Sequence, residues 1–341
     1  MQRIVIFLLI SATLLGLGLS ELNHRWKSVL TVPAGGLRFT VHSGDTLRTV
    51  AQELNDQGVL HHPRLLRLYG RWSGQDATIK RGEYLLPQYL DMASLLAVLN
   101  SGNVIQYQLT FPEGITLQDA LKTLSQETSI THTLDGSNDA GLLEMVAPHL
   151  SPEGLFFPDT YHYELGSNDW EILQRSFRRM QVVLSQEWAA KAEGLPYKSA
   201  YEALIMASII EKETGQAAER QQIAGVFVRR LQKHMRLQTD PSVIYGLGDK
   251  FDGNLRRADL QDETNSYNTY RHHGLPPSPI ALPGREAIHA ALHPDQGDTI
   301  YFVARGDGWH EFSSTLKQHQ KAVYKYQLKR RANYRSSPEK K

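Results

Sequence analysis

Two glutamates follow one of the most apolar stretches of the chain. Residues 203–210 read ALIMASII, and Glu211 and Glu213 come directly after them. In a helix a side chain contacts those three and four residues earlier, which for Glu213 are Ile210 and Ile209. Apolar surroundings disfavour the charged form of a carboxylic acid, so we expect Glu213 to have a raised pKa. A carboxyl that stays protonated near neutral pH can act as a general acid at a glycosidic oxygen.

A structural alternative exists for both acids. They could pair with Lys212, Arg220 or Arg229 at a solvated helix end, since structural ion pairs also perturb acids. Arg229, Arg230 and Arg236 could meet substrate carboxylates, but arginines on an amphipathic helix more often form its solvated face, and we expect that here.

Two polar segments downstream have the composition of a saccharide groove. Residues 235–246 read MRLQTDPSVIYG and residues 266–270 read SYNTY. Tyr rings stack on sugar faces, while Asn, Gln and Asp bind hydroxyl and acetamido groups, although ordinary loops use the same residues. The candidates for substrate binding, or for support of Glu213, are Gln238, Asp240, Asn268 and Tyr270.

The composition excludes several other chemistries. The chain has no Cys, and therefore no disulfide, thiolate metal site or thiol nucleophile. Its 37 basic and 36 acidic residues give no excess charge for nucleic acid. The 14 His residues form no H-E-x-x-H motif, and no phosphate-binding glycine loop occurs. We therefore expect neither a metal nor another cofactor.

The N-terminus has the hydrophobicity of a membrane segment. Residues 4–19 carry no charge, and 16 residues are near the lower limit for crossing a bilayer. Because no A-x-A site closes the run, we expect a single-pass, uncleaved signal anchor rather than a cleaved signal peptide or a buried core helix. The bulk of the chain is expected on the non-cytoplasmic side.

A strand, a glycine turn and a capped helix occur twice, at residues 37–54 and 109–124. The predicted fold class is α+β, with long helices at about residues 173–188 and 199–217 and a loop at 126–141. The expected parts are a cytoplasmic end (1–3), the anchor (4–20), a small α+β domain (37–125), a mixed α+β catalytic domain with its acid on a core helix (142–324), and a basic, disordered tail (325–341).

Residues 39–47, FTVHSGDTL, resemble the start of a LysM module, a fold that binds N-acetylated glycans. The small domain could therefore bind glycan, or it could act only as a spacer.

Four ordered blocks resemble the endolytic murein transglycosylase family, also called MltG or YceG-like. They are ASIIEKET at 207–214, RLQTDP with VIYG at 236–246, YNTY at 267–270 and GLPP at 274–277. Residues 153–156 (EGLF) and 158–161 (PDTY) also fit the family. The resemblance places the catalytic residue at the second Glu of E-K-E-T, which is Glu213.

The resemblance implies cleavage of the β-1,4 bond between N-acetylmuramic acid (MurNAc) and N-acetylglucosamine (GlcNAc) within peptidoglycan, without water and with a 1,6-anhydro-MurNAc product. It also implies a location in the inner membrane with the bulk in the periplasm, and peptidoglycan synthases as partners. Two alternatives remain open. A hydrolytic muramidase would need a second acid, for which Asp240 or Glu219 is available. A non-catalytic wall-binding scaffold would need none.

Overall fold

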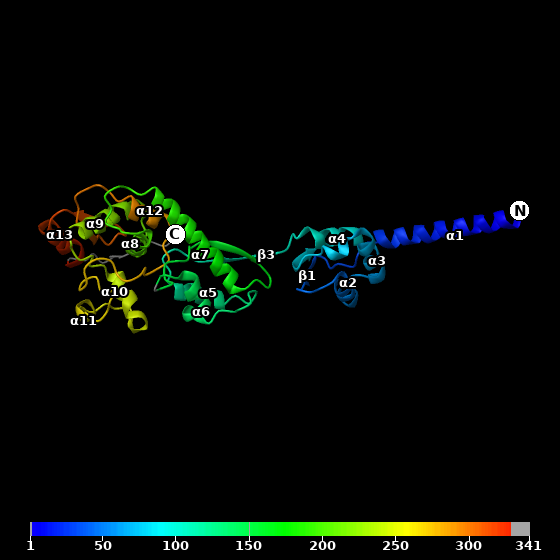
Figure 1. Cartoon of the computed structure of the whole chain (residues 1–341), viewed down its shortest axis with the longest axis horizontal. Helices are drawn as coiled ribbons and strands as arrows, with labels where there is room; N and C mark the ends of the chain where they lie inside the picture. The colour runs from blue at the N-terminus through cyan, green and yellow to red at the C-terminus, as the bar shows by residue number, and fades with distance from the viewer. Residues whose placement is uncertain (1, 150, 329–341) are drawn as a thin grey trace. The chain divides into compact units, whose positions relative to one another are not determined.

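The computed structural model describes residues 2–149 and 151–328, which form two compact units (Figure 1). Unit 1 contains the chain up to Gln108 together with His162–Ser167. Unit 2 contains Leu109–Tyr161 and the chain from Asn168 onward. Helices and short strands occur in both, so the predicted mixed α+β class is confirmed.

Unit 1 begins with the long helix α1 (Gln2–Lys27). An 18-residue window of this helix has a mean hydropathy of 2.1, and the span Ile4–Lys27 is the one helix among the described residues that is long and apolar enough to cross a membrane. Its apolar side chains are exposed, which excludes the buried core helix. The helix continues beyond the anchor predicted for residues 4–20, because the following turns are stabilised by a Glu21–Arg25 ion pair of 2.8 Å and contain no helix breaker.

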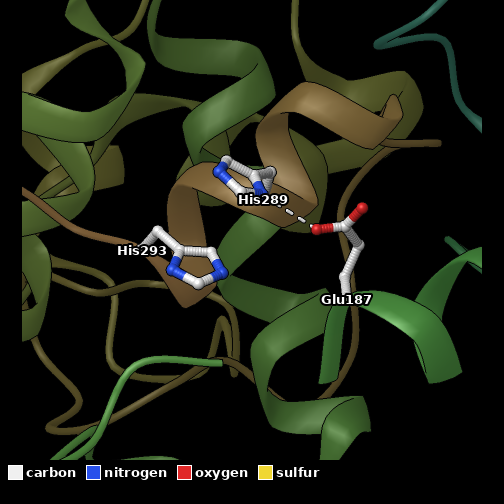
Figure 2. Close-up of side chains that lie close together, drawn as sticks. All are labelled: Glu187, His289 and His293. Atoms are coloured by element: carbon white, nitrogen blue, oxygen red, sulfur yellow. Dashed lines mark hydrogen bonds and ion pairs between the residues drawn. The ribbon is translucent and has the colours of Figure 1, made fainter. Parts of the chain in front are cut away.

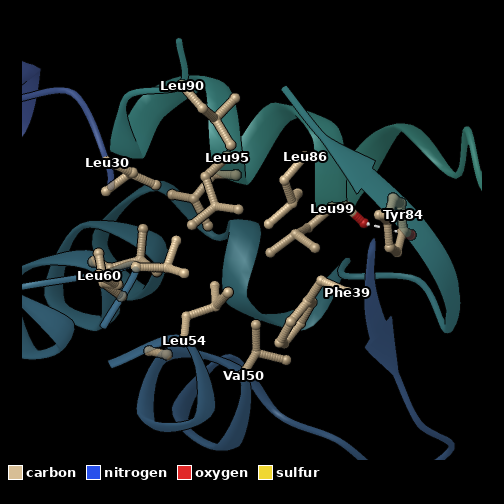
Figure 3. Packing of buried hydrophobic residues seen from close by; sticks show 14 of the residues in the cluster. Leu30, Phe39, Val50, Leu54, Leu60, Tyr84, Leu86, Leu90, Leu95 and Leu99 are labelled. Atoms are coloured by element: carbon tan, nitrogen blue, oxygen red, sulfur yellow. Dashed lines mark hydrogen bonds between the residues drawn. The ribbon is translucent and has the colours of Figure 1, made fainter. Parts of the chain in front are cut away.

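The rest of unit 1 packs three helices and an antiparallel strand pair around one core. The elements are β1 (Leu37–Val41), α2 (Leu47–Asp56), α3 (Pro63–Ser73), a 3₁₀ turn (Gln75–Ala77), β2 (Gly82–Leu86) and α4 (Met92–Ser101). Strands β1 and β2 are antiparallel, with Leu37 opposite Leu86. Figure 3 shows Phe39, Leu54 and Leu95 meeting in this core.

Both copies of the strand, turn and helix form as the sequence indicates. Thr46 and Thr116 cap α2 and α5 (Leu117–Ser125) through capping boxes, and Gly114 has the positive φ of +78° that its turn requires. The second copy, which we expected in the small domain, falls in unit 2. There the carboxylate of Glu153 accepts a hydrogen bond from the Leu117 amide at 3.0 Å.

Strand β3 (Gln106–Thr110) pairs with β4 (Thr160–Glu164), and each strand belongs partly to each unit. Unit 2 is otherwise mostly helical. Besides α5, its helices are α6 (Ala140–Val146), α7 (Asp169–Ala189), α8 (Ala200–Glu213), α9 (Arg220–Gln232), α10 (Asp240–Leu247), α11 (Arg257–Gln261), α12 (Arg285–Leu292) and α13 (Leu316–Val323). A third strand pair, β5 (Tyr301–Ala304) with β6 (His310–Ser313), precedes α13.

Helix α8 packs against α7, α9, α10 and α12, so it is the core helix that its apolar sequence predicts. It ends at Glu213 rather than at residue 217, because Thr214 is extended and Gly215 follows. Of the predicted tail, residues 325–328 continue a π-helical turn (Tyr324–Leu328), and residues 329–341 lie outside the described part of the chain.

Candidate active site

Helix α8 brings its two C-terminal acids to different surroundings. The hydroxyl of Ser199 caps its first turn by accepting from the Glu202 amide, and every residue from Ala203 to Ile210 is buried. A helix held this firmly fixes the positions of the side chains at its end. The two acids therefore differ through what the neighbouring segments present to them.

Glu211 is engaged in a structural ion pair. Its Oε1 lies 3.1 Å from a guanidinium nitrogen of Arg220, and its Oε2 accepts from the Gly284 amide at 3.0 Å. Burial raises the pKa of Glu211, and the charge of Arg220 opposes that rise. The ion pair with Arg220 that the sequence allowed is therefore present, but it is buried and does not lie at a solvated helix end. Lys212 pairs with neither acid but donates to the Gly114 carbonyl at 3.0 Å.

Glu213 has no cationic partner within 4.0 Å among the residues that the structure describes. Burial raises its pKa to about 7. A hydrogen bond from the Thr239 hydroxyl opposes this shift, and the negative charge of Asp240 adds to it. The predicted desolvation by Ile209 and Ile210 agrees with their complete burial. At neutral pH a large fraction of Glu213 therefore carries a proton.

Glu213 lines a polar cavity of about 400 Å³ in unit 2. Three of the predicted residues line the same cavity: Gln238, Asp240 and Tyr270. The lining also includes residues of β5, β6, α13 and the π-helical turn, which are Phe302, Val303, Ala304, His310, His319, Val323 and Gln327. A volume of this size lies within the range of small-ligand sites.

The three predicted residues are held in place by a short network. The Tyr270 hydroxyl donates to Oδ1 of Asp240 at 2.7 Å. The backbone N–H of Gln238 donates to the Thr269 carbonyl at 3.2 Å, and the backbone of Gln238 lies in the left-handed region at φ +54°. The side chain of Gln238 is thereby presented to the cavity from a backbone conformation that few non-glycine residues adopt.

Asn268, the fourth predicted residue, is fully buried and does not line the cavity. Its amide nitrogen donates to the carbonyls of Asp259 and Asp262, at 3.1 and 2.7 Å, and its side-chain oxygen accepts from the Tyr270 amide. Its place is therefore that of a supporting residue, which fixes the loop that carries Tyr270.

Sequence reasoning missed Arg230, which we expected on a solvated helix face. Arg230 is buried and lines the cavity, with its Nε donating to the Ile300 carbonyl and its Nη1 to the Leu237 carbonyl. Burial lowers its pKa. No local pattern separates it from Arg229, whose guanidinium instead binds the Thr299 and Asp295 carbonyls.

His310 enters the cavity wall in a fixed orientation. Its Nδ1 lies 2.8 Å from Oε2 of Glu219, and its backbone amide donates to the other carboxylate oxygen. Both carboxylate oxygens of Glu219 therefore contact His310. Glu219, one of the two acids considered as a hydrolytic partner, is absent from the cavity lining. Asp240 is the acid that shares the cavity with Glu213.

One group of potential metal ligands occurs elsewhere in unit 2. The ligand atoms of Glu187, His289 and His293 lie within 4.8 Å of one another (Figure 2). Glu187 accepts from Arg285 at 2.7 Å and lies 2.9 Å from Nδ1 of His289. Because the guanidinium of Arg285 already supplies positive charge there, a second cation beside it is disfavoured. The group does not line the cavity of Glu213.

Fold and site together define a mixed α+β protein that presents one buried acid to a polar cavity. A family model described as the YceG-like family matches residues 39–325, and the chain belongs to this family.

Relatives of known name agree with this placement. The endolytic murein transglycosylase of Bacillus subtilis is 31% identical over 309 residues, covering 85% of this chain and 84% of the relative. The protein of the same name from Streptococcus pneumoniae strain D39 is 26% identical over 340 residues, covering 88% of this chain but only 60% of the longer relative. A solved yceG-like protein of Listeria monocytogenes has a TM-score of 0.50 and 27% identity, covering 85% of this chain and 99% of that one.

Proposed function

We propose that this chain is an endolytic lytic transglycosylase of peptidoglycan. It cleaves the β-1,4 bond between MurNAc and GlcNAc inside nascent glycan strands, leaves a 1,6-anhydro-MurNAc end, and so terminates strand elongation. The observation that carries the proposal is Glu213, whose pKa is raised to about 7 at the wall of a polar cavity. The shared name of the B. subtilis and S. pneumoniae relatives supports the substrate and the reaction class.

One carboxyl group is sufficient for this reaction. Protonated Glu213 gives its proton to the glycosidic oxygen as the bond from C1 of MurNAc to that oxygen breaks. The resulting Glu213 carboxylate then takes the proton of the MurNAc C6 hydroxyl, while the C6 oxygen forms the new bond to C1. Water is not consumed, and Glu213 regains its proton. A pKa near the working pH suits a group that must act as both acid and base.

The remaining candidates have supporting roles in this scheme. The negative charge of Asp240 holds the pKa of Glu213 up, and the Tyr270 hydroxyl fixes the Asp240 carboxylate. Gln238 offers an amide to the hydroxyl or acetamido groups of the sugar. Asn268 holds the Tyr270 loop.

The test is mass spectrometry of muropeptides released from purified glycan strands by the full chain in detergent. We expect anhydro-muramoyl ends from the native chain and none above background from Glu213→Gln. Glu171→Gln, which alters an exposed acid on α7, is the matched control and should release the same products as the native chain.

The two alternatives give different results in the same experiment. Reducing MurNAc ends would indicate a hydrolytic muramidase, for which Asp240 is the water-activating candidate because it shares the cavity with Glu213. Glycan binding without release would instead indicate a wall-binding scaffold, with the LysM-like region of unit 1 as the binding element.

We further propose that α1 is a single-pass anchor in the inner membrane, with both units in the periplasm and peptidoglycan synthases as partners. The apolar, exposed surface of α1 supports the anchor. Attachment of a reporter to either end of the chain, followed by protease treatment of spheroplasts, tests the orientation.

A further inference from the structure

Unit 1 carries a concentration of arginine on one helix. Three arginines of α3 and one of α2 line a cavity of about 590 Å³, and these are Arg48, Arg64, Arg67 and Arg71. Asp76 is the one acid in that lining. The sequence from Gln57 to Gln75, which includes all of α3, contains no Asp or Glu. The surface is therefore strongly positive.

These four arginines are exposed, and none has a carboxylate within 4.0 Å in the described part of the chain. Like charges that are gathered without internal partners repel one another, and an external anion relieves that repulsion. Planar guanidinium groups match phosphate in particular.

The same helix exposes two large apolar side chains. Leu68 is 68% exposed and Trp72 is 81% exposed, and they lie one turn apart on α3. The opposite face of α3, with Leu66 and Gly70, is buried in unit 1. A helix that presents Arg together with Leu and Trp to solvent has the composition of helices that lie in a membrane interface.

Helix α3 is joined to the end of α1 by aromatic contacts. The ring centroids of Trp26 and Tyr69 lie 4.0 Å apart, and those of Tyr69 and Trp72 lie 5.9 Å apart. Figure 1 shows α3 beside the C-terminal end of α1 within unit 1. Trp26 is seven residues, or about 10 Å of helix, beyond Leu19, where the uncharged run ends. Trp and Tyr collect at this depth, at the level of lipid headgroups.

We propose that α3 binds the anionic phospholipid headgroups of the bilayer that holds α1. The four arginines bind headgroup phosphates, while Leu68 and Trp72 enter the interface. Unit 1 is then attached to the membrane at two points, the anchor and this surface. The inference rests on the proposed membrane location of α1 and adds a lipid-binding site to it.

The test exploits the absence of Cys, which permits a single label at any chosen position. The full chain carrying Leu68→Cys is labelled with an environment-sensitive fluorophore and reconstituted into vesicles of phosphatidylcholine, with or without phosphatidylglycerol. We expect a blue shift and quenching by brominated lipid on the phosphatidylglycerol vesicles. Asn103→Cys, an exposed position three residues before β3, is the control label and should stay in water on both.

A charge variant tests the role of arginine directly. In Arg64→Gln/Arg67→Gln/Arg71→Gln we expect the ratio of inserted to free label to fall about fivefold for each arginine removed. The matched control changes three exposed arginines elsewhere, Arg81, Arg178 and Arg257, and should leave the ratio unchanged. Circular dichroism of both variants checks that unit 1 remains folded.

The outcomes separate this proposal from the proposed function. Flotation with the vesicles tests the anchor, and release of anhydro ends tests Glu213. A chain that floats and cleaves glycan, but whose Leu68 label stays in water or responds equally in both arginine variants, would overturn the lipid-binding proposal alone. Failure to float would overturn the anchor and the lipid-binding surface together.

Discussion

Unit 2 contains two buried glutamates whose pKa burial raises to about 7, Glu153 and Glu213. Glu153 sits between elements, where its carboxyl accepts from the Leu117 amide at 3.0 Å and from the Tyr245 hydroxyl at 3.2 Å. Glu213 accepts from Thr239 and lines the cavity. Glu153 is absent from that lining.

The difference shows that a raised pKa does not by itself identify a catalytic acid. Both acids are desolvated, but Glu153 joins the start of α5 to α10, whereas Glu213 faces space that a ligand can enter. Access to the cavity therefore supports the proposed catalytic role for Glu213 and not for Glu153.

The largest effect is expected for Glu213→Gln. Because glutamine cannot donate the proton to the leaving oxygen, we expect the rate of anhydro-end formation to fall about 10²- to 10⁴-fold. Muropeptide mass spectrometry on a time course measures it. Glu153→Gln should stay within about twofold of the native rate, and an equal loss in both variants would abolish the distinction drawn above.

The pH dependence of cleavage should follow the same acid. The reaction needs protonated Glu213, so above pH about 7 we expect the rate to fall about tenfold for each pH unit. Initial rates between pH 5 and pH 9 measure this limb. The fall of the rate above pH 7 should be unchanged in Glu153→Gln. If it disappears in that variant, Glu153 and not Glu213 is the acid that titrates.

A smaller change is expected for Asp240→Asn. Removing this negative charge lowers the pKa of Glu213, so the falling limb should move to lower pH and the rate at pH 8 should drop by up to about tenfold. Tyr270→Phe retains the charge and serves as the control. Complete loss of cleavage with Asp240→Asn, across the whole pH range, would instead favour a water-activating role.

The last effect concerns stability rather than the rate of cleavage. The folded pKa of Glu153 is about 7 and its ordinary value is 4.5, so the folded state binds more protons between these values. The contribution of Glu153 to the free energy of unfolding therefore falls as pH rises from 4.5 to 7, by an amount on the order of 3 kcal/mol. Glutamine does not titrate, so in Glu153→Gln the free energy of unfolding should change less between pH 5 and pH 7.5 than in the native chain. Urea unfolding at the two pH values measures this change. An equal change of unfolding free energy with pH in the variant and the native chain would contradict this role of Glu153.

Local sequence patterns predicted the features that depend on near neighbours. The capped helices at Thr46 and Thr116 and the burial of Glu213 follow from residues within one helical turn. Hydropathy indicated the apolar segment at residues 4–20 but not the helical turns that continue it to Lys27.

Features that depend on distant segments could not be predicted in this way. Arg230 is buried because its guanidinium binds the Ile300 carbonyl, 70 residues away. Phe302 and His310 reach the cavity only through the β5–β6 pair, and nothing near them in sequence indicates Glu213. The separate place of Asn268 likewise follows from carbonyls of the preceding loop.

The left-handed backbone of Gln238 has a consequence for engineering. A non-glycine residue at φ +54° costs on the order of 1 kcal/mol, and glycine would remove that cost. Gln238→Gly should therefore make the protein harder to unfold while depriving the cavity of an amide. Selection for thermostability alone would favour the change and selection for turnover would oppose it, so this position is one where the two aims conflict.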